Sequence, residues 1–508
     1  MKIDFTKHAR RNMLAGFLFR GIRLVFPFLN RTLFLWLLGP EFLGLNGLFA
    51  SVLGVLSLAE LGFGTAVICS MYKPVADGDR TLLRAYLNFY RTLYRWVGGW
   101  IFAVGLFLAP FLRQLIHGDL PEGLNLYILY FAYLFNTAAS YFFFAYRGSV
   151  LAAHARRDVI SNISSFVEVL KYVCVSLVLF LTRNYYGYVA VTVAFTLLYN
   201  LLLLRESRRI FPDLFPEGKL DVQRRRSVLS DAKSIFMHKV GGTVTGSSDN
   251  LVISWALGLV AVAAYGNYYY VAVSVAGLVG TVASSMTGGF GNKIHTESRE
   301  TNFRLFLKAN RVVMLVALWC TAVMAAVYQP FIEVWTRNDP TLVRHTVTPV
   351  LMVLYFIVNQ SRQTLLTFKS AAGLWKGDRW KPIVAGAANL AISLGLVIVL
   401  PEGWKLDGVI FGTIASILLI QIPWETHVLF TGFFTAEQKY RFLIEQFSFG
   451  ALAVWLCFGS WLAGVAVMAD GPAGLMLKGV AASGAATAVL LLLFRRDCLE
   501  LMHIIRRK

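Results

Sequence analysis

The amino-acid sequence predicts an all-α integral membrane protein with about 14 transmembrane helices, arranged as two parallel six-helix lobes plus two C-terminal helices. Three observations carry this prediction. Of the 508 residues, 57% are hydrophobic and only 15% are charged, whereas soluble domains carry about 25% charged residues. The apolar residues form runs of about 20, the length that a helix needs to cross a bilayer. The two halves of the chain also resemble each other at a nearly constant offset.

The apolar runs define the predicted helices one by one. They lack the alternation of barrel strands, so helices are the form expected in a bilayer. No stretch between the runs is long enough to fold as a separate domain. The predicted spans are 14–38, 46–72, 86–112, 123–146, 160–182, 185–204, 232–257, 262–287, 305–328, 345–368, 382–400, 406–428, 443–468 and 473–494.

The basic residues predict how these helices are oriented. With a cytoplasmic N-terminus, 38 of the 48 Lys and Arg residues fall in cytoplasmic loops, tails and helix ends, six lie at the outer side, and four lie deeper within spans. Cytoplasmic loops carry an excess of Lys and Arg, so we expect both termini in the cytoplasm. The same bias accounts for the net charge of +20 without a nucleic-acid partner.

An internal repeat relates the first six spans to the next six. Trp36 and Gly39 align without a gap to Trp255 and Gly258. Six is an even number, so both halves enter the membrane from the same side and the repeat is parallel. Two such lobes are typical of transporters. Offsets of 220 or 221 residues also pair Arg91 with Arg311, Asp158 with Asp378, Gly187 with Gly408 and Thr192 with Thr413.

The repeat predicts the domain organisation. Residues 1–204 form an N-lobe and residues 232–430 a C-lobe, joined by a cytoplasmic linker, 205–231. Residues 431–508 lie outside the repeat and supply helices 13 and 14 with a basic cytoplasmic tail.

Motifs of several known chemistries are missing from the sequence. It contains no GxxxxGK[ST] phosphate loop, no HExxH zinc motif and no CxxC pair among its five cysteines, so a nucleotide site or a metal centre has no sequence support. We therefore predict a transporter rather than an enzyme, without cofactor or metal.

Charged side chains cluster on one face of the first span. Arg20, Arg23, Asn30 and Arg31 fall within about a third of the circumference at about 100° per residue. An arginine at the bilayer centre costs about 2.5–3.5 kcal/mol, so this face should meet water or a partner. Glu60 in the second span is a candidate charge partner or ion-coupling residue, but one acid cannot neutralise three bases. Since guanidinium groups bind phosphate bidentately, we expect this face to attract an anion.

Other spans carry further polar side chains. Asp249 in the seventh span is expected either to bind a coupling cation or to pair with one of the arginines, because intramembrane acids mark ion pathways. Glu168 and Lys171 lie three residues apart, a spacing that favours an ion pair along the helix. Asn359 and Arg362 in the tenth span are expected to line the substrate cavity.

Three stretches resemble a known family of membrane proteins. Residues 30–45, with Gly39 and Glu41, are similar to the end of the first helix in bacterial polysaccharide exporters of the Wzx type. Residues 57–64 resemble their second helix, and residues 249–266 resemble the start of their second lobe. The family is the polysaccharide transporter branch of the multidrug/oligosaccharidyl-lipid/polysaccharide exporter superfamily.

The resemblance implies two lobes that alternate access around a central cavity. It implies a flippase that moves polyprenyl-diphosphate-linked oligosaccharides to the outer leaflet of the bacterial cytoplasmic membrane, for capsule, exopolysaccharide or lipopolysaccharide synthesis. Candidate partners are then membrane lipids, a polysaccharide polymerase and glycosyltransferases, with H+ or Na+ as candidate coupling ions. Many members have twelve spans, so the fourteen predicted here are a departure.

Three alternatives stay open at the level of sequence. A lipid II flippase of the same superfamily would also have fourteen spans. A cation-coupled multidrug extruder would favour an acidic cavity, whereas the first span here is basic. A non-transporting scaffold of a polysaccharide assembly complex is the fourth hypothesis.

Overall fold

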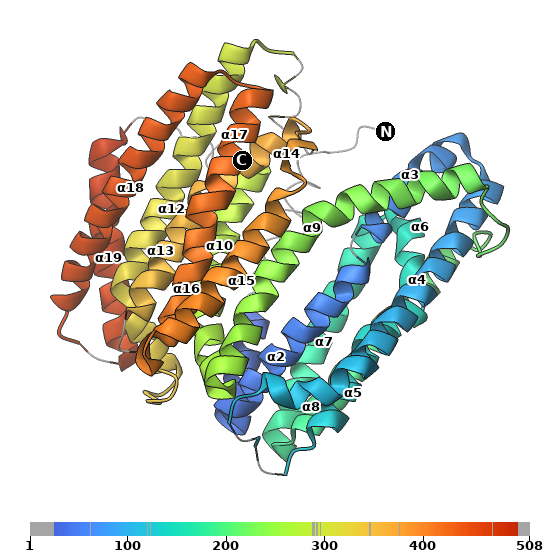
Figure 1. Cartoon of the computed structure of the whole chain (residues 1–508), viewed down its shortest axis with the longest axis horizontal. Coiled ribbons are helices and arrows are strands. Elements are labelled where there is room, and N and C mark those ends of the chain that lie inside the picture. Colours follow the sequence, from blue (N-terminus) through green and yellow to red (C-terminus); the bar gives the residue numbers. More distant parts are fainter. Residues whose placement is uncertain are drawn as a thin grey trace, which may run out of the picture. The chain divides into compact units, whose positions relative to one another are not determined.

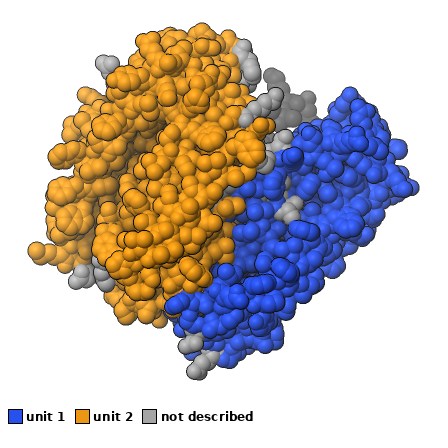
Figure 2. All heavy atoms as spheres, viewed as in Figure 1, with its two compact units in different colours: residues 1–243 blue, residues 244–508 orange. Residues whose placement is uncertain are grey.

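A computed structural model shows helices throughout the part of the chain that it describes, which confirms the predicted fold class. The chain divides into two compact units, unit 1 (residues 1–243) and unit 2 (residues 244–508), coloured separately in Figure 2. The division falls inside one long helix, α9 (Val222–Leu257). The described residues are 25–60, 62–118, 120–121, 123–286, 290, 293–294, 296–344, 347–374, 376–469 and 471–495.

Unit 1 is a bundle in which α4 packs against α5, α5 against α8, and α7 against α8. Short 3-10 helices interrupt or extend three of the longer ones. Figure 1 shows these elements in colours from blue through cyan to blue-green. In chain order they are Val25–Leu38, α2 (Pro40–Leu56), η1 (Ser57–Glu60), α3 (Phe63–Asp77), α4 (Arg80–Leu108), η2 (Ala109–Leu115), α5 (Leu126–Phe142), η3 (Ala145–Arg147), α6 (Gly148–Ala153), α7 (Arg157–Thr182) and α8 (Tyr185–Ile210).

Unit 2 packs its longest helix, α12, against α13, α18 and α19. The region between η5 and α17 is nearly continuous, but a π-helical segment, η6, separates α16 from α17. The elements of this unit are α10 (Leu259–Ser285), α12 (Arg299–Trp335), α13 (Thr348–Ser361), α14 (Gln363–Ala371), η4 (Lys376–Asp378), α15 (Lys381–Val399), η5 (Glu402–Trp404), α16 (Lys405–Ser416), η6 (Ile417–Gln421), α17 (Ile422–Gly432), α18 (Ala436–Val465) and α19 (Gly471–Leu493).

The chain is a multi-pass membrane protein. Among the described residues, nine helical segments are long and apolar enough to cross a membrane, or ten if the bent pair Leu126–Phe142 and Ala145–Ala153 forms one span. Each predicted span overlaps a helix or a pair of helices, but the count of fourteen is not confirmed. Breaks explain part of the difference, because α2 and α3 are separated at Gly62, and α13 ends beside Arg362.

Two pairs of glycines that the predicted repeat aligns have similar local conformations or surroundings. Gly39 precedes α2 with φ 101°, and Gly258 precedes α10 with φ 84°. These are conformations that side chains with a Cβ rarely adopt. Gly187 and Gly408 also have similar surroundings, because each lies close to a side chain near the end of the preceding helix. A Cβ on Gly187 would lie 3.0 Å from Val178 Cγ1 of α7, and a Cβ on Gly408 would lie 2.8 Å from Leu400 Cδ1, next to α15.

Gly62 combines a positive φ with a close approach to another helix. Its φ is 102°, and an added Cβ would lie 3.0 Å from the backbone nitrogen of Phe236 and still closer to the carbonyl oxygen of Ala232. Both contacts are backbone atoms of α9 within unit 1, so they cannot move aside as a side chain can. This glycine lies two positions after the end of η1 and directly precedes α3.

Gly62→Ala is expected to destabilise the protein more than Gly39→Ala. Gly39 has the same φ to within one degree but nothing within 4 Å of its Cβ position, so the control variant carries only the backbone strain, about 1–3 kcal/mol. Thermal denaturation midpoints in detergent measure the difference. Equal shifts for the two variants would contradict a role for the contact with α9.

Candidate functional site

The described part of the first predicted span carries a polar face in unit 1. Asn30 is 6% exposed, and its side-chain nitrogen has no hydrogen-bond partner among the described groups. Arg31 is half-buried and interacts electrostatically with Tyr188 of α8. Arg20 and Arg23, the other two arginines predicted on this face, lie outside the described residues. Within unit 1 the face therefore combines an orphaned amide with one guanidinium group.

The two predicted charge partners of unit 1 have neighbours within that unit. Glu60 ends η1, and its Oε1 accepts a hydrogen bond from the Tyr94 hydroxyl at 3.1 Å. Glu168 accepts one from Ser164 at 3.1 Å and attracts Lys171 electrostatically. The Lys171 ammonium also lies 4.8 Å from the centre of the Tyr172 ring. Aromatic and hydroxyl groups thus stabilise charges that would otherwise face hydrocarbon.

Asp249 lies at the centre of a buried polar cluster in unit 2. The Tyr265 hydroxyl donates to its Oδ2 at 2.8 Å, the Thr413 hydroxyl to the same oxygen at 2.9 Å, and the Asn389 amide to Oδ1 at 3.1 Å. Ser393 joins the cluster by donating to the side-chain oxygen Oδ1 of Asn389 at 3.3 Å. Four helices, α9, α10, α15 and α16, supply these side chains, which we call the Asp249 cluster.

The composition of the Asp249 cluster suits a small hard cation or a proton. Asp249 is 3% exposed, and none of its hydrogen-bond partners among the described residues is a Lys or an Arg. A carboxylate buried without a cationic partner is costly. Carboxylate, amide and hydroxyl oxygens are the ligands that hard cations prefer, and the cluster offers all three.

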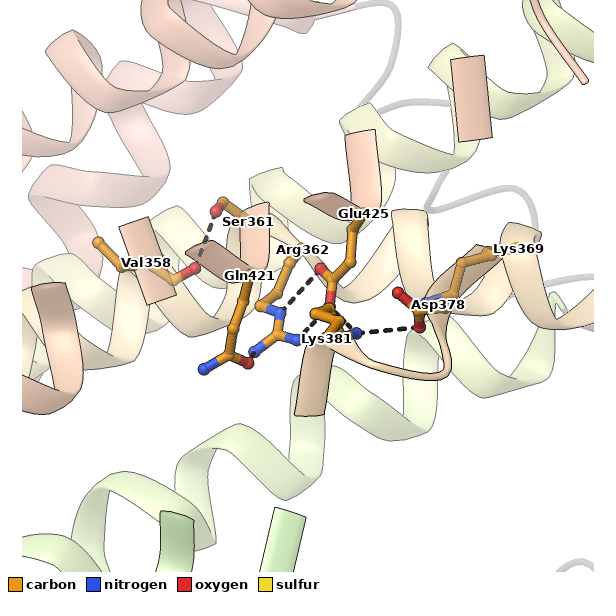
Figure 3. A network of polar contacts seen from close by, with 8 residues as sticks. All are labelled: Val358, Ser361, Arg362, Lys369, Asp378, Lys381, Gln421 and Glu425. Carbon is orange, nitrogen blue, oxygen red and sulfur yellow. Dashed lines mark hydrogen bonds and ion pairs between the residues drawn. The ribbon is translucent and has the colours of Figure 1, made fainter. Parts of the chain in front are cut away.

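Arg362 belongs to a second buried network in unit 2, shown in Figure 3. Its Nε donates to Glu425 at 3.0 Å, its Nη2 binds the other oxygen of the same carboxylate, and its Nη1 donates to Gln421 at 2.5 Å. Lys381 donates to Glu425 at 2.6 Å and lies 3.1 Å from Asp378. Lys369 also pairs with Asp378. We call these six residues the Arg362 network.

The Arg362 network joins the break between α13 and α14 to η4, α15 and α17. Its three bases outnumber its two acids, and each of the five charged side chains is at most a tenth exposed. Arg362 was predicted to line the substrate cavity, and its guanidinium is already bound by Glu425 through Nε and Nη2 and by Gln421 through Nη1. Asn359, the other residue predicted there, is half-buried in α13. Their contact with substrate stays a prediction.

An open groove of about 1150 Å³ in unit 2 runs between α12, α13 and α18. Its walls are almost entirely apolar, with Val350, Leu354 and Phe447 among the lining side chains. Hydrocarbon chains of the bilayer suit such a surface, because it offers few polar groups. The groove is therefore unsuited to a phosphate or a sugar.

Comparison with known proteins places the chain in a family. The family model described as "Polysaccharide biosynthesis protein" matches residues 9–287, which is more than half of the chain. The chain belongs to this family. The match covers unit 1 and continues through α9 and α10, so it includes both Arg31 and Asp249. No curated protein matches this polysaccharide biosynthesis family member.

Solved structures share the fold of this family member. A lipid II flippase MurJ in an inward closed conformation is 15% identical, with a TM-score of 0.62 over 94% of this chain and 100% of that one. An inward-facing multidrug resistance MATE family transporter of the MOP superfamily is 14% identical, with a TM-score of 0.57 over 80% and 94%. A MATE transporter in complex with MaL6 has a TM-score of 0.51. At these identities the likeness shows that the chain shares their fold and nothing more.

Sequence reasoning found Asp249 and Arg362 but missed the residues that hold them. Glu425 is a carboxylate within an apolar span, so the rule that flagged Asp249 also applies to it. Asn389 and Thr413 are among the few polar positions in largely apolar stretches of α15 and α16, which is a weaker signal. Which polar residues pair across helices depends on packing, and the sequence alone does not give it.

Proposed function

We propose that this protein is a flippase for polyprenyl-diphosphate-linked oligosaccharides, the lipid-linked units from which cell-surface polysaccharides are made. The observation that carries the proposal is the basic and amide-bearing face around Asn30 and Arg31 in a chain of the polysaccharide biosynthesis family. Guanidinium groups suit a diphosphate, and an unsatisfied amide suits a sugar hydroxyl or a phosphate oxygen. Arg20 and Arg23 would extend the same face.

The proposed mechanism is alternating access between the two units. In the first state the polar face of unit 1 is open to the cytoplasm and takes up the diphosphate and its sugars, while the prenyl chain stays in the bilayer. In the second state the same face opens to the outer leaflet. The two compact units and the transporter fold of the solved relatives support such a cycle.

The Asp249 cluster is proposed as the coupling site. One carboxylate that exchanges a cation or a proton between the two states would link substrate movement to an ion gradient. Tyr265, Asn389 and Thr413 come from three different helices, so filling or emptying the cluster changes how α9, α10, α15 and α16 pack. H+ and Na+ are both candidates for this site, since a carboxylate can take up either ion.

The proposal includes a location and partners. The resemblance to bacterial polysaccharide exporters favours the cytoplasmic membrane of a bacterium. The distribution of basic residues favours a cytoplasmic position for both termini. A polysaccharide polymerase would consume the exported unit and glycosyltransferases would assemble it. Both are therefore proposed as functional neighbours.

Depletion of the protein in its own cells tests the function. We expect a non-peptidoglycan oligosaccharide on polyprenyl diphosphate to accumulate, as measured by mass spectrometry of extracted lipids. Re-expression of the wild type should restore the pool, whereas Arg31→Ala at equal protein level should restore it at least ten-fold less effectively. An unchanged lipid pool after depletion would refute the proposal.

A lipid II flippase is the second candidate. The specific observation in its favour is the fold match to a lipid II flippase, which covers all of that chain at a TM-score of 0.62. The same lipid extraction separates the two candidates, because accumulated lipid II would replace the oligosaccharide. A multidrug extruder receives less support, since a cationic drug would meet the positive charge of Arg31.

A further inference from the structure

A second basic site lies in unit 1, away from the first span. A pocket of about 520 Å³ is lined by Arg91, Arg95, Arg147 and Arg208, together with aromatic rings that include Phe144 and Tyr146. No Asp or Glu is among the described residues that line it. We call it the four-arginine pocket. Its volume falls in the range of about 300–1,000 Å³ that is typical of small-molecule sites.

Three separate elements bring the arginines together. Arg91 and Arg95 are four residues apart on α4 and therefore share a face. Arg147 is the last residue of η3, at the bend between α5 and α6. Phe144, the residue before η3, has a positive φ of 56°. Arg208 stands in the last turn of α8. Four like charges converge only because the fold holds these elements in place.

The acids near the pocket do not neutralise it. The charges of Arg91 and Arg208 act on Arg147 and repel it, while the carboxylates of the surrounding segment pair with other bases. Because these carboxylates form ion pairs with arginines outside the pocket, the pocket keeps its positive charge. The pairs are Arg80 with Asp213 at 2.7 Å, Arg84 with Glu217 at 3.3 Å, and Arg209 with Glu206 at 3.7 Å.

Two of the guanidinium groups keep buried donors without a partner. Arg147 is 2% exposed. Its Nη1 donates to the carbonyl oxygen of Leu214 at 2.5 Å, but its Nε has no acceptor among the described groups. The Nε of Arg91 is likewise buried and unsatisfied. Buried donors are almost always hydrogen-bonded in native proteins, so these point to an acceptor supplied by a ligand.

The position of the pocket along α4 indicates the depth at which a ligand would lie relative to the bilayer. Arg91 and Arg95 precede the apolar part of α4, which begins with Trp96. Trp96 is 75% and Trp100 63% exposed, and exposed tryptophans mark the level of lipid headgroups. The pocket thus lies where α4 enters the membrane. Basic pockets between helices at this level are suited to phosphorylated headgroups.

We propose that the four-arginine pocket binds the phosphate groups of a membrane-lipid headgroup at the leaflet where α4 begins. Each phosphate can take a bidentate hydrogen bond from an arginine, and the orphaned Nε groups of Arg91 and Arg147 gain an acceptor. The headgroup can come from an anionic phospholipid of the bilayer or from a prenyl diphosphate. The site is separate from the first span, so it does not depend on the proposed export function.

Native mass spectrometry of the purified full chain tests the proposal with four probes. These are phosphatidylglycerol, a polyprenyl diphosphate, soluble pyrophosphate, and phosphatidylcholine as the reference with no net charge. The test variant is Arg95→Gln with Arg208→Gln, because both side chains are exposed and their loss should leave the fold intact. The control is Arg209→Gln with Arg224→Gln, which removes the same charge from outside the pocket.

The wild type is expected to bind at least one anionic probe more tightly than phosphatidylcholine. The test variant should bind it at least ten-fold more weakly, and the control should match the wild type. Preference for phosphatidylglycerol identifies a bilayer lipid, and preference for the polyprenyl diphosphate identifies a carrier lipid. Equal binding of pyrophosphate would overturn the assignment to a lipid headgroup and leave a site for a free anion. Equal losses in test and control variants, or no probe bound above phosphatidylcholine, would overturn the proposal.

Discussion

Replacing Asp249 with alanine is expected to abolish cation-dependent stabilisation of the protein and to lower export at least ten-fold. The carboxylate is the acceptor for Tyr265, Asn389 and Thr413 and is almost wholly buried. A cation that binds only the folded protein stabilises it by about 2.7 kcal/mol at one hundred times its dissociation constant. Alanine removes the carboxylate of the Asp249 cluster, so this stabilisation should disappear.

The measurement compares thermal denaturation midpoints in sodium chloride and in choline chloride of equal ionic strength. Asp407→Ala is the matched control, because Asp407 is also 3% exposed but pairs with Thr348 and lies outside the Asp249 cluster. A sodium response that survives in Asp249→Ala would contradict the coupling role. A wild type without a sodium response, combined with lost export in the variant, would assign the role to a proton.

Glu425→Ala should destabilise the protein by about 3–5 kcal/mol, the usual effect of removing one partner from a buried ion pair. Glu425 is wholly buried and binds both Arg362 and Lys381. Without it, the Arg362 network would keep three bases and the single carboxylate of Asp378. The expected result is little folded protein after membrane extraction, as measured by size-exclusion chromatography and thermal denaturation.

Glu445→Ala is the control, because Glu445 binds Arg311 with similar two-bond geometry but in a more exposed place, where such pairs contribute about 1 kcal/mol or less. The double variant Arg362→Leu with Glu425→Leu removes both charges and should recover most of the stability. If it recovers stability and export, the network is structural. If Glu425→Ala is no less stable than Glu445→Ala, the buried pair is not a stabilising element.

The fold was largely predictable, because the lengths of the apolar runs and the offset between the two halves can both be read directly from the sequence. Gly39 and Gly258 were paired by alignment, and both have the positive φ that explains why glycine stands there. The span count was harder. The predicted span 345–368 is divided into α13 and α14 at Arg362, where the side chain forms hydrogen bonds with Glu425 and Gln421. A hydropathy pattern does not reveal such a break.

The polar sites were predictable only in part. An acid or arginine within an apolar run stands out, so Asp249 and Arg362 were found. Their partners were not, because Glu425 is 63 residues from Arg362 and Asn389 is 140 residues from Asp249. The four-arginine pocket was also missed, since its members are dispersed among ordinary cytoplasmic basic residues, and only the fold brings them together.

The number of residues in the π-helical segment η6, between α16 and α17, determines which way the side chains on either side of it point. Thr413 and Glu425 are twelve residues apart, which in a regular α-helix places them about 120° apart. A π-bulge takes up one extra residue, and this reduces the difference to about 20°. Both side chains can then reach α15, where Thr413 contacts Asn389 and Glu425 binds Lys381. One inserted residue therefore keeps the Asp249 cluster and the Arg362 network in phase, so this segment should tolerate substitutions far better than a deletion.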